Sequence, residues 1–196
     1  MNTARKVSGR HSYADYLRWD DTRRFELVDG IPYDMTPAPS RKHQEISMKL
    51  SVIIAGHLHG RHYSVYAAPF DVRLADGSER DEDIATVVQP DIVVVCDPRK
   101  LDERGCTGAP DLVIEIASPV TASRDMKEKL SLYERHGVKE YWIVFPGEGD
   151  SMRLVLVFTA GKDGGYGRPG VYAPGDTLKS KTLRGLSVSL DEIFGS

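Results

Sequence analysis

Two acidic residues on neighbouring predicted strands are the best-placed residues of this sequence to do chemistry. Asp91 opens the apolar segment 91–95, and Glu115 lies inside the apolar segment 112–116. A carboxylate inside a buried strand is costly unless it is paired or holds a cation. Carboxylate oxygens on adjacent strands are the ligands that Mg²⁺ and Mn²⁺ prefer. The pattern therefore predicts a divalent-metal site, and an internal salt bridge is the alternative role for Glu115.

A lysine on the next predicted helix is the expected partner of these carboxylates. At about 100° per residue, Lys129 falls in the apolar arc of a helix near residues 124–136, whereas Lys127 falls on the opposite side. A buried lysine needs a partner, and Glu115 would supply one. Asp125, at the start of this helix, is either a charge favoured by the helix dipole or a group that orients Lys129.

Three other polar residues are candidates for accessory or structural roles. Glu26 lies between residues that should be buried, and it is either a further metal ligand or a partner for Lys129. His43 shares the apolar stripe of a long helix, which favours a hydrogen-bonded core histidine over a metal ligand. Asp111 shares a strand face with Glu115 but lies ~13 Å from it at ~3.3 Å per residue, so we expect a structural role.

The order of predicted elements positions these residues in one α/β domain. Asp29-Gly30 predicts a two-residue hairpin turn between strands 25–28 and 31–35, and Pro32 predicts that the second strand is at an edge. We expect a mixed sheet flanked by helices, with an additional C-terminal hairpin. Residues 1–11 are predicted to be a flexible N-terminus and residues 12–196 a single domain. The remaining predicted elements are helices 13–19, 124–136 and one running from Ser40 to about residue 59, and strands 63–67, 70–74, 87–96, 112–116, 140–145, 153–159, 170–173 and 186–190.

Composition narrows the class of protein. The 196 residues are 40% hydrophobic and 28% charged, which is ordinary for a soluble domain. The net charge of −3 argues against a generic nucleic-acid coat protein but is compatible with an acidic metal site. No apolar run approaches the ~20 residues that span a bilayer. The two cysteines have no metal-type spacing, and we expect a cytoplasmic protein with reduced thiols.

Several short motifs in a fixed order resemble one bacterial protein family. The motifs are Phe25-Glu-Leu-Val-Asp-Gly30, His43, Gln89-Pro-Asp91, Pro110-Asp-Leu-Val-Ile-Glu-Ile-Ala-Ser-Pro119, Asp125, Lys129 and Gly137-Val-Lys-Glu-Tyr-Trp-Ile-Val144. In these motifs the sequence resembles the Uma-type restriction endonuclease family, which belongs to the PD-(D/E)xK nuclease superfamily, over roughly residues 12–190.

The resemblance implies a fold and a reaction. It implies a restriction-endonuclease-like fold and Mg²⁺- or Mn²⁺-dependent hydrolysis of DNA. Asp91 and Glu115 match the acidic residues of the motif, and a backbone carbonyl near Ile116 would complete the metal ligands. Ala117 stands where the motif has its lysine, and Lys129 matches the lysine that this family supplies from the following helix.

The resemblance implies DNA as the partner and leaves one rival function. No membrane is expected, because no apolar run is long enough to span one, and the edge hairpin at residues 153–173 together with the apolar C-terminal tail could support a homodimer. The alternative is a non-catalytic DNA-binding or assembly module that retains the nuclease fold. Metal-dependent cleavage distinguishes the two.

Overall fold

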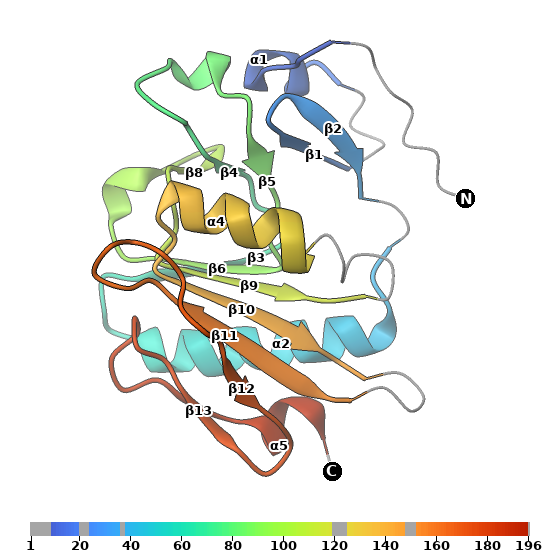
Figure 1. Ribbon diagram of the computed structural model, residues 1–196, viewed down its shortest axis with the longest axis vertical. Helices are drawn as coiled ribbons and strands as arrows, with labels where there is room; N and C mark the ends of the chain where they lie inside the picture. Colours follow the sequence, from blue (N-terminus) through green and yellow to red (C-terminus); the bar gives the residue numbers. More distant parts are fainter. Residues whose placement is uncertain (1–8, 20–23, 36–37, 119–124, 148–151, 196) are drawn as a thin grey trace.

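Two six-stranded sheets form the framework of the described structure (Figure 1). The computed structural model describes residues 9–19, 24–35, 38–118, 125–147 and 152–195; within residues 125–126 it describes the backbone only. The sheet that we call the central sheet runs in the order β12 (Gly170–Tyr172), β11 (Leu154–Thr159), β10 (Glu140–Phe145), β9 (Leu112–Ile116), β6 (Ile92–Val95) and β3 (Ser64–Ala67). The N-terminal sheet runs in the order β2 (Ile31–Asp34), β1 (Phe25–Val28), β5 (Val87–Val88), β4 (Val72–Arg73), β8 (Gly105–Thr107) and β7 (Leu101–Asp102).

One long helix, several short helical segments and a separate pair of strands complete the described structure. The long helix is α2 (Arg41–Leu58), and the helix nearest the candidate site is α4 (Leu130–His136), which continues a π-helical turn, η3 (Asp125–Lys129). The others are α1 (Tyr13–Tyr16), α5 (Leu190–Phe194) and the 3₁₀ turns η1 (Asp81–Asp83) and η2 (Pro98–Lys100). Strands β13 (Thr177–Lys179) and β14 (Ser187–Ser189) pair with each other.

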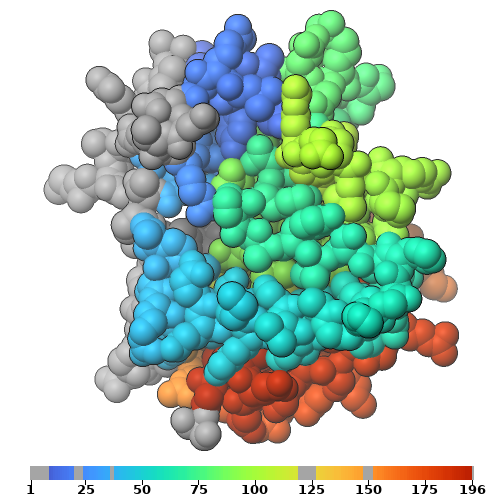
Figure 2. Space-filling model, turned by 180° about the vertical axis from the view of Figure 1, so that it is seen from behind, coloured from blue at the N-terminus to red at the C-terminus, as the bar shows by residue number. Residues whose placement is uncertain are grey.

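The central sheet is buried on both faces. Helix α2 covers one face with Ile46, Leu50, Ile54 and Leu58, the i, i+4 stripe that its sequence predicts. Seen from behind, α2 crosses the surface with the C-terminal segment below it (Figure 2). Helix α4 and the N-terminal sheet lie over the opposite face (Figure 1). Because side chains alternate along a strand, Ile114 faces α2 and Glu115 faces α4.

The structure corrects two expectations about the strands. The predicted strand 87–96 is two strands, with β5 in the N-terminal sheet and β6 in the central sheet. Pro90 stands between them, and its missing N–H group ends the ladder there. The single mixed sheet that we expected is consequently two mixed sheets. The hairpin prediction is confirmed, because Asp29 (φ 49°) and Gly30 (φ 80°) form the turn and β2 is an edge strand.

A buried glutamate fastens the C-terminal segment to the central sheet. Glu140, which is fully buried, accepts hydrogen bonds on Oε2 from the Ser180 hydroxyl and from the N–H groups of Lys181 and Thr182. Its Oε1 accepts one from Trp142 Nε1 at 2.7 Å. This carboxylate therefore has a structural function at the start of β10. Among the described residues, no helix has the length and apolar character that crossing a membrane requires.

Candidate active site

The register of the central sheet brings Asp91 and Glu115 to adjacent positions. β6 and β9 are antiparallel, with Ile92 opposite Ile114 as the last pair, so Asp91, which directly precedes β6, and Glu115 occupy the next position along each segment. Residues directly opposite each other in such a pair have Cβ atoms about 5 Å apart. Helix α4 lies over this part of β9 (Figure 1). Residues 24 positions apart in the chain therefore meet because of one strand pairing.

Asp91 is anchored through one of its two carboxylate oxygens. Oδ2 accepts the Ile116 N–H at 2.7 Å and lies 3.1 Å from His43 Nε2. No described residue donates to the second oxygen, Oδ1, and the side chain is 17% exposed. His43 Nδ1 is buried without a hydrogen-bond partner among the described residues, so the ring proton belongs on Nε2, where it donates to Asp91. His43 thus orients Asp91 from the first turn of α2.

Lys129 lies between two buried glutamates. Its Nζ donates to Glu115 Oε1 at 2.7 Å and to Glu26 Oε1 at 2.9 Å, and its side chain is only 6% exposed. The contact with Glu115 is the one that the helical period predicts. Lys127 on the same helix is exposed. Lysine, whose charge is compact, is rarely buried without such partners.

Glu26 comes from the other sheet and joins the two sheets at this point. It lies on β1, and its Oε1 also accepts the Gln89 N–H at 3.0 Å. The side chain is 1% exposed. Of the two roles expected for Glu26, the structure contains the pairing with Lys129. We call Glu26, Glu115, Lys129 and Tyr133 the glutamate–lysine cluster.

Tyr133 is a member of this cluster that the sequence analysis missed. Its hydroxyl donates to Glu115 Oε1 at 2.7 Å, one helical turn after Lys129. Burial, together with the negative charges of Glu115 and Glu26, raises the pKa of Tyr133 well above its ordinary value, so the hydroxyl remains a donor. The i, i+4 spacing from Lys129 was the available signal.

The other candidates lie elsewhere or outside the described side chains. Asp111 is at the opposite end of β9, where it accepts the Cys96 N–H and pairs with Lys139 at 2.6 Å. Burial raises the pKa of Asp111, but the hydrogen bonds from Lys139 and Cys96 lower it by more, so its pKa lies below the ordinary value. The structural role expected for Asp111 agrees with this. The Asp125 side chain is outside the described part of the structure.

The oxygen ligands at this site fit a hard cation, although Oε1 of Glu115 accepts a hydrogen bond from Lys129. Among the described residues, no three His, Cys, Asp or Glu groups converge as a metal cluster. Magnesium is commonly held by one or two carboxylates, with water and substrate phosphates as its other ligands. Asp91 Oδ1 has no donor among the described residues, and the Asp91 carboxylate adjoins the strand of Glu115. The donors present therefore suit Mg²⁺ or Mn²⁺.

Comparison with known proteins defines the class to which this fold belongs. The chain has a restriction-endonuclease-like fold: a crystal structure described as a putative nuclease belonging to DUF820, from Anabaena variabilis ATCC 29413, matches it with a TM-score of 0.72. That match covers 93% of this chain and 97% of the other chain at 19% sequence identity. A likeness at this identity establishes the fold.

The family follows from the sequence comparison. The model of the family Uma2, described as "Putative restriction endonuclease", matches residues 13–191. The chain therefore belongs to the Uma2 family. A relative, the uncharacterized protein slr1290 of Synechocystis sp., is 26% identical over 182 residues, which is 92% of this chain and 89% of the relative.

Proposed function

We propose that this protein is a divalent-metal-dependent endonuclease that hydrolyses DNA phosphodiester bonds. The observation that carries the proposal is that Asp91 accepts the N–H of Ile116, the residue after Glu115, at 2.7 Å, while Lys129 lies 2.7 Å from Glu115. Two oxygen ligands and a cationic donor are the groups that phosphodiester hydrolysis needs. Membership of the Uma2 family and the likeness to a protein described as a nuclease support the same reaction.

Each residue of the site has a separate task in this proposal. Asp91 and Glu115, with a backbone carbonyl near Ile116, would hold the cation. When bound, Mg²⁺ or Mn²⁺ supplies Lewis-acid stabilisation of the phosphate and promotes ionisation of water. Lys129 orients the attacking water or stabilises the negative charge that develops on the phosphate. His43 fixes the Asp91 carboxylate, and Tyr133 and Glu26 fix the positions of Glu115 and Lys129.

A non-catalytic DNA-binding or assembly module is the second candidate function. One observation favours it: Oε1 of Glu115 already accepts hydrogen bonds from Lys129 and Tyr133. A carboxylate that remains turned toward those donors is a structural group. The two functions differ in a single measurement, cleavage of DNA when a divalent cation is added.

Plasmid cleavage tests the proposed function directly. We expect the purified chain to nick or linearise plasmid DNA with Mn²⁺ or Mg²⁺ and to leave it intact with EDTA. Asp91→Asn should lose this activity, since the amide keeps the shape but not the charge that holds a cation. Asp111→Asn is the matched control, because Asp111 also follows a proline but lies at the far end of β9. Absence of cleavage by the parent on any DNA would favour the binding module.

Removing the Tyr133 hydroxyl tests the positioning of Glu115. Tyr133→Phe keeps the ring in the core and deletes only the donor to Glu115 Oε1. We expect cleavage to fall about tenfold, with a higher Mn²⁺ concentration needed for half-maximal rate, since outer partners of a metal ligand typically contribute 10–100-fold. Tyr166→Phe is the control, because that hydroxyl donates to the Val138 carbonyl and not to the cluster. Equal Mn²⁺ dependence in both variants would rule out the positioning role.

We also propose that the protein forms a homodimer through the edge of the central sheet. Strand β12 is one edge of that sheet, and Val171 on it is 62% exposed. Exposed edge strands can pair with a second copy of a chain.

A further inference from the structure

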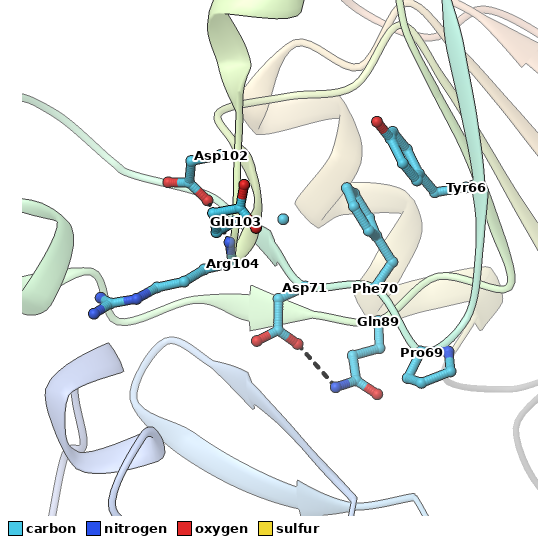
Figure 3. Close-up of a pocket in the computed structure, with 9 residues that line it drawn as sticks. Tyr66, Pro69, Phe70, Asp71, Gln89, Asp102, Glu103 and Arg104 are labelled. Atoms are coloured by element: carbon cyan, nitrogen blue, oxygen red, sulfur yellow. Dashed lines mark hydrogen bonds between the residues drawn. The ribbon is translucent and has the colours of Figure 1, made fainter.

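A cavity beside the candidate active site combines an aromatic wall with an acidic one. Its volume is about 410 Å³, within the range of pockets that hold small organic groups. Figure 3 shows the Phe70 ring on one side, Glu103 and Arg104 on the other and Asp71 between them, with Gln89 below Phe70 and hydrogen-bonded to Asp71. The Tyr66 ring stacks on Phe70 at a centroid distance of 4.2 Å and an interplanar angle of 3°. Another planar group entering the cavity would extend this stack.

The polar groups of the cavity leave one carboxylate oxygen for a ligand. Asp71 Oδ1 accepts hydrogen bonds from Tyr16 and from Gln89 Nε2, at 3.0 and 2.8 Å. The described residues contribute no donor to Asp71 Oδ2. Burial raises the pKa of Asp71 more than the Gln89 and Tyr16 hydrogen bonds lower it. A donor brought by a ligand would therefore offset the cost of the buried charge.

The charges of the lining residues favour a base over a phosphate. The acidic residues are Asp71, Asp102 and Glu103, and the one cationic lining residue is Arg104. Arg73 donates to both oxygens of Asp102 and also to both oxygens of Asp81, so one guanidinium serves two carboxylates. The lining carboxylates outnumber Arg104 and would repel a phosphate group, whereas an amino group on a nucleobase would donate to Asp71. Stacking on an aromatic ring is the usual way that proteins hold an unpaired base.

The cavity adjoins the residues that we propose as metal ligands. Its Pro69 and Phe70 follow Ala68, whose N–H donates to the Asp91 carbonyl at 3.0 Å. Gln89, which holds Asp71, also donates its N–H to Glu26 of the glutamate–lysine cluster. From Glu115 on β9 across β6 to Ala68 is about two strand spacings, or ~10 Å. A strand with a phosphate at Asp91 and Glu115 could place a neighbouring base in this cavity.

We infer that this cavity binds one unstacked nucleobase carrying an exocyclic amino group, so that the enzyme prefers single-stranded DNA. The inference rests on the proposed endonuclease function and names its substrate class. Phe70 supplies the stacking surface, and Asp71 Oδ2 accepts from the amino group. A base inside a duplex cannot reach such a pocket, because its faces and edge are already engaged.

Binding of two matched oligonucleotides tests the inference without catalysis. Short single strands of cytosine or thymine nucleotides, of which only cytosine carries an exocyclic amino group, are compared by fluorescence anisotropy in EDTA. We expect the parent to bind oligo-dC more tightly than oligo-dT. Phe70→Leu should weaken both about tenfold, the typical effect of losing one stacked base. Asp71→Asn should abolish only the preference for oligo-dC, because its Oδ1 still accepts from Tyr16 and Gln89.

A control variant and a cleavage assay separate this inference from the proposed function. Tyr63→Leu is the control. Tyr63 is an exposed aromatic residue that directly precedes β3, whereas Pro69 and Phe70 of the cavity follow the other end of that strand. It should bind both strands as the parent does. If the parent shows the oligo-dC preference but never cleaves with Mn²⁺, the base site stands and the endonuclease function fails. If the parent cleaves DNA but binds oligo-dC and oligo-dT equally, the base site fails and the endonuclease function stands. The same conclusion follows if the folded Phe70 and Asp71 variants bind both strands as the parent does.

Discussion

Replacing Glu115 by glutamine is expected to remove metal-dependent DNA cleavage while leaving the protein folded. Glutamine keeps an oxygen that can accept from Lys129 and Tyr133, so both hydrogen bonds can persist. The negative charge that would hold a cation is lost. We expect cleavage to fall by at least about a hundredfold, more than for loss of an outer partner such as the Tyr133 hydroxyl. The measurement is the initial rate of plasmid nicking with saturating Mn²⁺.

Two further glutamate variants give the result its meaning. Glu140→Gln is the control for loss of a buried carboxylate, because Glu140 is equally buried but holds the C-terminal segment. It should lose thermal stability and retain its nicking rate at low temperature.

Glu26→Gln tests whether Glu26 is a further metal ligand or only a partner of Lys129. Retention of most activity makes Glu26 a partner of Lys129 only, and a loss as deep as that of Glu115→Gln adds it to the ligands. A Glu115→Gln variant as active as the parent would exclude this site from any cleavage observed.

Local sequence signals predicted the parts of the fold that depend on neighbours in the chain. The Asp29-Gly30 turn follows from the backbone conformations that these residues tolerate. The stripe on α2 and the inward position of Lys129 follow from the helical period. The two segments that carry Asp91 and Glu115 were expected to be neighbouring strands, and β6 pairs with β9.

Contacts between distant segments could not be predicted in this way. The division of residues 87–96 between two sheets depends on β1 reaching Val87 from 60 positions earlier, at Leu27. Nothing near Val87 in the sequence specifies that partner, because strand register is decided by tertiary packing. The hydrogen bond from Gln89 to Glu26 follows from the same pairing. Sequence patterns therefore located the candidate site but not the second sheet that supplies one of its glutamates.

Removing the amine of Lys129 is expected to destabilise the fold more than any other single change at the site. Lys129→Ala would leave Glu115 and Glu26 without the ammonium group that now lies within 2.9 Å of both. Breaking a buried ion pair from one side typically costs about 3–5 kcal/mol of unfolding free energy. Lys127→Ala, on the exposed side of the same turn, should change stability by no more than about 0.5 kcal/mol. Urea denaturation at pH 8 measures both.

The pH dependence identifies charge as the cause. Without Lys129, protonation of the two carboxylates removes part of the cost of burying them, so the deficit of Lys129→Ala should shrink between pH 8 and pH 5. A cavity left by the lost side chain would instead give a deficit that is independent of pH. Equal stability of the Lys127 and Lys129 variants at every pH would contradict a stabilising role for the ion pair.

A lysine introduced at a second position tests whether the amine beside Glu115 can be supplied from another part of the chain. Ala117 is buried directly after β9, two residues beyond Glu115. In the Lys129→Ala background, Ala117→Lys would return an ammonium group to the neighbourhood of Glu115. We expect part of the lost stability and part of the Mn²⁺-dependent nicking to return, since both depend on a cation beside that carboxylate. Recovery of stability without nicking would make Lys129 a structural ion-pair partner, and recovery of neither would show that only the α4 side can supply the amine.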